Sequence, residues 1–288
     1  MRLALVVATL VTAATYSAFV AFAKPAPVDP YAQHVTALKK RLEAKGFKNL
    51  AFTIEKPFVV VGNRGATALE RDASTVRWAV TMLEQDFFQT RPKKILDVYL
   101  FGDAASYERG VVKLTGHEPS TPYGFYSPSD GALFMNIATG GGTLVHEIVH
   151  PYVEADFPGA PPWLNEGLGS LFEQSAERGG HIVGLTNWRL AGLKRADEAD
   201  TIPTFEKLTH YTTTEFYGDD SGVNYAASRY LLYYLQEKRL LRDFYAQMKA
   251  NQDEDPSGYR TLQKILDEKD MAAFETRWEL FVAKLSFP

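Results

Sequence analysis

The first half of the chain alternates short, mainly apolar runs with longer stretches of helical spacing. Residues 58–61 and 95–101 are such runs, bounded by turn residues, which is typical of buried strands. Between them, apolar positions such as Val76 and Val80 recur on one helix face and predict a long helix over residues 68–88. Strands that alternate with helices in this way predict a mixed sheet with helices packed against it.

A third strand is predicted at residues 132–137, after a stretch rich in aromatic and turn residues at 116–128. Tyr123, Phe125 and Tyr126 lie on that stretch. They are expected either to line a groove for substrate or to cover the sheet, and the pattern leaves both alternatives open.

The second half of the chain is mainly helical in its pattern. Residues 194–200 are charged and predict a solvated turn, and residues 203–217 predict a loop with one short helix. Four further helices are predicted at residues 225–238, 240–250, 259–266 and 271–285. The chain as a whole therefore predicts an α+β protein with a mixed N-terminal lobe at residues 31–155 and a helical C-terminal lobe at residues 156–288.

The N-terminus has the pattern of an export signal. Arg2 precedes an uncharged run over residues 3–23 that ends in Ala21-Phe22-Ala23, a small-residue cleavage site. The sequence therefore predicts a signal peptide at residues 1–23 and a periplasmic or extracellular protein, and residues 24–30 form a proline-rich spacer. The alternative is an uncleaved segment that anchors the protein in a membrane, because the run is about long enough to cross one.

Composition narrows the chemistry further. The chain of 288 residues is 45% hydrophobic and 23% charged, as expected for a globular protein with a substantial core. It has no cysteine, which excludes disulfides, thiolate metal ligands and a cysteine nucleophile. The formal net charge of −4 offers no basic surface for nucleic acid. Composition leaves the oligomeric state open.

One five-residue motif, His146-Glu147-Ile148-Val149-His150, has the H-E-x-x-H pattern. In this pattern two imidazoles one helical turn apart bind zinc, and the glutamate between them acts on water. On a helix the two histidines and Glu147 share one face with Thr143, and the apolar residues of the segment lie on the other. By itself the motif is short enough to occur on an ordinary exposed helix.

A second segment strengthens the zinc interpretation. Thirteen residues after His150 begins a predicted helix over residues 163–173, WLNEGLGSLFE, which follows Pro161-Pro162. Glu166 lies on its polar face. A carboxylate from this helix would complete a site with three protein ligands and leave the fourth position to water, as in catalytic zinc sites.

These two segments together resemble the gluzincins, zinc peptidases with HExxH on one helix and a glutamate ligand on the next, and the wider pattern resembles the bacterial peptidase MA-like families. The resemblance implies a zincin-like fold and one Zn²⁺ per chain, held by His146, His150 and Glu166 with Glu147 as general base. It also implies that Tyr225 stabilises the transition state. Arg229, four residues later, could replace Tyr225 in that role or assist it, and a packing role for Tyr225 stays an alternative.

The resemblance also predicts the surroundings of the site. It implies that residues 132–138 form an edge strand to which an extended substrate adds. The sequence Leu133-Phe134-Met135-Asn136 lacks the glutamate with which aminopeptidase relatives capture a free amine. Pro151 directly follows His150 and is expected to kink or stop the helix there.

Several polar residues are candidates for a supporting role. Thr143, Ser170 and Glu173 either orient the imidazoles by hydrogen bonds or are ordinary polar residues of helix surfaces, and the sequence leaves both alternatives open. Of the remaining histidines, only His210 is a candidate for proximity to the metal.

The leading hypothesis is an exported zinc metallopeptidase that hydrolyses peptide bonds of peptide or protein substrates with zinc-activated water. The alternative is a zinc-stabilised binding or scaffold module of the cell envelope that is catalytically inactive. A helical protein without metal is a third possibility, and it would show no change in stability with a chelator.

Overall fold

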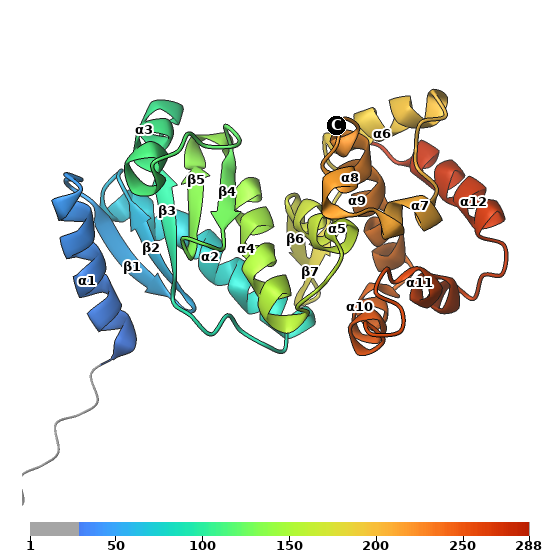
Figure 1. Cartoon of the computed structure of the whole chain (residues 1–288), viewed down its shortest axis with the longest axis horizontal. Coiled ribbons are helices and arrows are strands. Elements are labelled where there is room, and N and C mark those ends of the chain that lie inside the picture. Colours follow the sequence, from blue (N-terminus) through green and yellow to red (C-terminus); the bar gives the residue numbers. More distant parts are fainter. Residues whose placement is uncertain (1–28, 288) are drawn as a thin grey trace, which may run out of the picture.

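The computed structural model describes residues 29–287, which form an α+β fold (Figure 1). The first half of the chain contains α1 (Pro30–Ala44), β1 (Ala51–Glu55), β2 (Phe58–Gly62), α2 (Ala66–Asp86), β3 (Leu96–Phe101), α3 (Ala104–Thr115), β4 (Gly124–Ser127), β5 (Ala132–Asn136), η1 (Ile137–Thr139) and α4 (Gly141–Asp156). The second half contains α5 (Pro162–Phe172), β6 (Ser175–Arg178), β7 (His181–Gly184), α6 (Arg189–Glu198), α7 (Phe205–His210), α8 (Thr213–Phe216), α9 (Ser221–Glu237), α10 (Leu241–Ala250), α11 (Tyr259–Leu266) and α12 (Met271–Lys284). The predicted signal peptide at residues 1–23 lies outside the described residues.

The five-stranded sheet is mixed, as predicted, with the strand order β1-β2-β3-β5-β4. Strands β2, β3 and β5 are parallel, and β1 and β4 pair antiparallel at the two edges. The sequence analysis did not predict β1, because this half-exposed edge strand carries only a short apolar pattern. The prediction of residues 132–138 as an edge strand was wrong: β5 lies between β3 and β4, and β4 is the edge strand.

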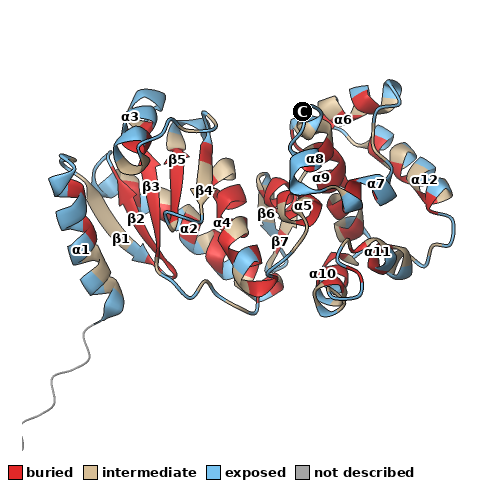
Figure 2. Ribbon diagram, viewed as in Figure 1, coloured by how far each residue is buried: buried red, intermediate tan, exposed pale blue. Residues whose placement is uncertain are grey.

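Both faces of the sheet are covered by helices (Figures 1 and 2). Alternate strand residues point to opposite faces, so Val59 and Val61 pack with α1 and α3, whereas Phe58 and Val60 pack with α2 and α4. The inner strand β2 is therefore buried along its whole length. This burial explains why its sequence is a continuous apolar run rather than an alternating one.

Helix α4 links the two halves of the molecule, because it packs against the sheet and α2 on one side and against α5 on the other. Of the two predicted effects of Pro151, a kink or a stop at His150, the stop was wrong, because α4 continues to Asp156 with Pro151 inside it. Proline has no N–H, so the carbonyl of Glu147 loses its usual helical donor at that point. The turn after Pro151 is held by the burial of Tyr152 and Val153 in the core.

The second half is mainly helical, with α5 packed closely against α9. Residues 194–200, predicted to be a turn, belong largely to α6 because Leu190, Leu193 and Ala196 form a buried face beneath the charged residues. The β6–β7 hairpin was not predicted, and residues 203–217 contain two short helices, α7 and α8, rather than one.

In the part of the chain that the structure describes, no helix has both the length and the apolar character that a membrane crossing requires.

Candidate metal centre

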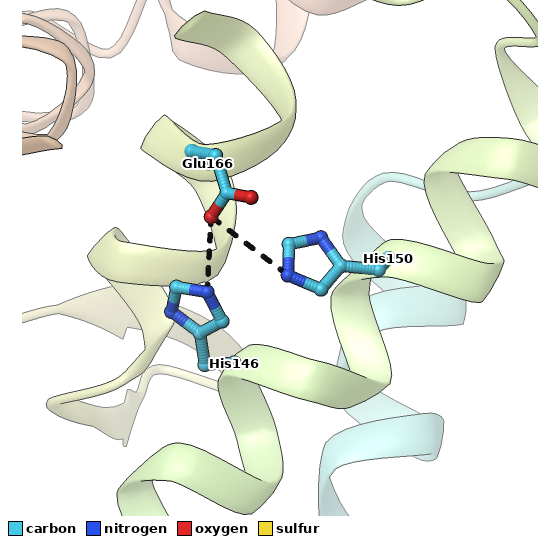
Figure 3. Close-up of side chains that lie close together, drawn as sticks. All are labelled: His146, His150 and Glu166. Carbon is cyan, nitrogen blue, oxygen red and sulfur yellow. Dashed lines mark hydrogen bonds and ion pairs between the residues drawn. The ribbon is translucent and has the colours of Figure 1, made fainter. Parts of the chain in front are cut away.

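Two helices bring three potential metal ligands together (Figure 3). Helix α4 contributes His146 and His150, and α5 contributes Glu166. One ligand atom from each lies within 4.8 Å of the other two. The Nε2 atoms of His146 and His150 lie 3.1 and 3.8 Å from Glu166 Oε2. All three side chains are buried or nearly so.

These separations fit a small cation between the three ligands. Ligand atoms about 2.1 Å from a tetrahedral zinc ion are roughly 3.4 Å apart, which lies between the two observed separations. The set of two imidazoles and one carboxylate is also a donor set that divalent transition metals favour. The residues present therefore fit a metal ion, as the sequence predicted.

The close approach of α4 and α5 depends on glycines. A Cβ atom on Gly169 would lie 3.0 to 3.1 Å from three atoms of the His146 ring, so only glycine leaves the ring its full space. At Gly142, near the start of α4, a Cβ would lie 2.3 Å from the carbonyl oxygen of Glu173. Gly167 plays a different part, because its Cβ would meet Leu232 and Ser228 of α9.

Asn165 and Tyr217 support the ligands, although the sequence analysis did not select them. Asn165 Oδ1 lies 3.0 Å from His150 Nδ1, so this ring nitrogen donates its hydrogen and Nε2 keeps a lone pair for a metal. Tyr217 donates its hydroxyl hydrogen to Glu166 Oε1, the oxygen that faces away from the imidazoles. Asn165 directly precedes Glu166 in the motif, whereas no local pattern marks Tyr217.

The supporting partners that the sequence predicted bind elsewhere. Ser170 donates to the backbone carbonyl of Glu166, and Glu173 forms an ion pair with Arg189 at 3.1 Å. Within residues 29–287, no hydrogen bond joins Thr143 to either imidazole. Residues on the same helix face as a ligand thus do not necessarily contact it.

Glu147 lies beside the three ligands without belonging to them. Its Oε2 is 3.7 Å from His150 Nε2 and accepts a hydrogen bond of 2.9 Å from the backbone N–H of Tyr126 on β4. Burial, together with the nearby charge of Glu166, raises the pKa of Glu147 to about 7, although His150 and the Tyr126 amide act in the opposite direction. A carboxyl group in this environment can both accept and release a proton near neutral pH.

The pKa of Glu166 is shifted in the opposite direction from that of Glu147. Burial opposes its ionisation, but His150, His146 and the Tyr217 hydroxyl favour the carboxylate and lower its pKa. Burial and the carboxylate of Glu166 raise the pKa of both Tyr217 and Tyr225. Both tyrosines therefore remain protonated hydrogen-bond donors.

Tyr225 on α9 lies at the site, as the resemblance implied. It lines the pocket beside the ligands, and its ring stacks on that of His146, with centroids 6.4 Å apart and an interplanar angle of 19°. Arg229 does not line the pocket. It is fully buried and donates to the backbone carbonyls of Ser170 and Leu185. The prediction that Arg229 replaces or assists Tyr225 was therefore wrong, because this arginine ties α9 to α5 and to the chain after β7.

The other histidines lie apart from the three ligands. His210, the histidine singled out for a check of its distance from the metal, is exposed, and its Nδ1 lies 2.7 Å from the carbonyl oxygen of Glu206; it does not belong to the three-residue group. Ring nitrogens of His34 and His181 lie 2.7 Å from carboxylate oxygens of Asp97 and Asp86, within hydrogen-bond distance.

A pocket of about 610 Å³ opens beside the ligands. Its walls include the edge strand β4, so Phe125 and Tyr126 line it, whereas Tyr123 is exposed outside it. Two groups on β4 are already engaged: the backbone of Gly124 bonds to the Thr121 hydroxyl, and the Tyr126 amide bonds to Glu147.

No family model matches this chain, and no curated protein matches it.

Proposed function

We propose that this protein is a zincin-like, zinc-dependent peptidase that cleaves peptide bonds with Glu147 as general base. One observation carries the proposal: two imidazoles and a carboxylate from neighbouring helices converge within 4.8 Å, next to a second carboxylate and an open pocket. A purely structural metal site would be closed by a fourth protein ligand.

The side chains have separate tasks in this proposal. His146, His150 and Glu166 would hold the ion, with His150 oriented by Asn165. Zinc in such a site acidifies water and polarises a carbonyl group. Glu147 takes a proton from the attacking water and returns it to the nitrogen of the departing amine, while the carbon–nitrogen bond of the peptide breaks.

The developing negative charge on the carbonyl oxygen needs a hydrogen-bond donor. Tyr225 lines the same pocket and stays protonated, so we assign this role to it. Tyr217 is engaged with Glu166, and we assign it the task of holding that ligand.

The test of this proposal is the Glu147→Gln variant. It is expected to retain about one zinc per chain and to lose hydrolysis of a fluorogenic peptide library by roughly 10²- to 10⁴-fold, the usual contribution of a general base. Glu198→Gln, at the exposed end of α6, is the matched control and should keep both properties. Full activity in Glu147→Gln would refute the proposed mechanism.

One observation favours the inactive binding module instead. The N–H groups of Gly124 and Tyr126 on the edge strand are already occupied, which hinders the addition of a substrate strand there. A digest of the library with and without chelator separates the two functions. A binding module yields no chelator-sensitive products, whereas a peptidase does.

A further inference from the structure

The pocket beside the candidate metal centre has an unbalanced charge. Among the described residues that line it are three glutamates, Glu147, Glu154 and Glu166, and no lysine or arginine. A divalent cation held by His146, His150 and Glu166 would offset the charges of Glu147 and Glu166. Glu154 then remains as the single charge in the pocket without a counter-charge.

Glu154 is well placed to meet a bound peptide. It lies on α4 one turn beyond His150, on the same side of the helix, and it is exposed. The rise of a helix places it roughly 10 Å along the axis from Glu147. A substrate residue with a long charged side chain could therefore reach Glu154 with the end of that side chain while its own backbone lies near Glu147.

Tyr126 connects the two carboxylates. Its backbone N–H donates to Glu147 Oε2 at 2.9 Å, and its hydroxyl donates to Glu154 Oε2 at 2.8 Å. This bond orients the Glu154 carboxylate on the wall of the pocket. A carboxylate accepts about four hydrogen bonds, so the bond from Tyr126 leaves capacity for an ammonium or guanidinium group.

We propose that Glu154, oriented by Tyr126, binds a lysine or arginine side chain of the substrate and makes the enzyme selective for basic peptides. This inference rests on the proposed peptidase function and names its substrate class. Apolar neighbours such as Val153 and Phe157 line the same pocket and suit the aliphatic part of a lysine or arginine side chain.

The test compares internally quenched peptides that differ at one position, where they carry lysine, methionine or glutamate. For the zinc-loaded wild type, kcat/KM is expected to be about fivefold higher for the lysine peptide than for the methionine peptide, as for a partly exposed ion pair. Glu154→Gln should abolish that ratio, and Glu154→Lys should reverse the order of the lysine and glutamate peptides. Glu198→Gln, outside the pocket, is the matched control and should keep the wild-type ratio.

Binding provides a second readout that needs no turnover. In zinc-loaded Glu147→Gln, the anisotropy of labelled peptides should show tighter binding of the lysine peptide than of the glutamate peptide, and added salt should reduce the difference. Introducing Glu154→Gln into this variant should remove it.

The outcomes separate the two proposals. Cleavage of all three peptides at equal rates, unchanged in Glu154→Gln and Glu154→Lys, would overturn the role of Glu154 and leave the peptidase intact. If the wild type cleaves no peptide but Glu147→Gln still binds the lysine peptide through Glu154, the peptidase function fails and the basic-peptide site stands.

Discussion

Helix α4 carries two buried polar clusters that are satisfied in opposite ways. At its C-terminal end, Asp156 accepts hydrogen bonds from the amides of Gln89 and Thr90 and from the Tyr245 hydroxyl, and it forms an ion pair with Lys249 at 2.9 Å. In the middle of the helix, two carboxylates and two imidazoles face one another instead.

The difference indicates what each cluster does. The Asp156 carboxylate is surrounded by donors and one cation of the protein itself, so it stabilises the fold without any ligand. The cluster around Glu166 contains more hydrogen-bond acceptors than donors, because among the hydroxyl and amide groups of the described residues only the Tyr217 hydroxyl and the Tyr126 amide donate to its two carboxylates. The cluster could hold a cation from outside the chain, and we expect its stability to depend on metal.

The largest expected effect comes from the metal itself. Free Zn²⁺ at about a thousand times its dissociation constant should stabilise the wild type by roughly 4 kcal/mol. His146→Ala removes one ligand and should abolish most of this gain. His181→Ala, a histidine that pairs with Asp86 away from the site, is the control and should keep it. Thermal unfolding with zinc and with chelator measures the difference, and an equal gain in His146→Ala would contradict the assignment.

Disrupting the Asp156 cluster should lower the stability of the fold without changing metal binding. Asp156→Asn removes a buried charge that has a cationic partner and three other donors, and we expect a loss of about 3 kcal/mol in the free energy of unfolding. Zinc content should stay near one per chain. Chemical denaturation and metal analysis of the same sample check both statements, and loss of zinc in this variant would mean that the two clusters are coupled.

The difference in stability between the wild type and Asp156→Asn should depend on pH. Burial by itself raises the pKa of Asp156, but the bonds from Lys249, Tyr245 and the Thr90 amide outweigh it and lower the pKa. The folded protein therefore binds this proton less readily than the unfolded chain does. The stability advantage of the wild type over Asp156→Asn should be fully present above about pH 4 and decline as the pH falls below it.

The smallest expected effects come from substitutions of two glycines in α5, and these effects should differ in kind. Gly169→Ala places a methyl group against the His146 ring and should weaken zinc binding by roughly 10- to 100-fold, as other disturbances of ligand orientation do. Gly167→Ala crowds Leu232 and should instead cost about 1–3 kcal/mol of stability with little change in zinc affinity. Competition with a zinc indicator dye and denaturation measure the two quantities, and the same response in both variants would contradict this assignment.

Much of the fold could be predicted from local pattern. The parallel strands, the long helix α2 and the helices from α9 to α12 follow apolar runs and helical spacings that depend only on near neighbours in the chain. The weak edge strand β1 and the β6–β7 hairpin escaped prediction because their short segments are only partly buried. The strand order that makes β4 the edge strand depends on contacts between segments distant in the sequence.

The candidate site divides in the same way. Sequence alone determined that His146 and His150 share one face of a helix, because a spacing of four residues is a local property of the backbone. Tertiary packing decided that Glu166 Oε2 lies within 3.8 Å of both Nε2 atoms and that the Tyr126 amide holds Glu147. It also decided that Arg229 is buried in the core and bonds to backbone carbonyls instead of lining the candidate metal centre. The physical reason is that hydrogen bonds between helices and strands depend on how those elements pack, and helical periodicity carries no information about that packing.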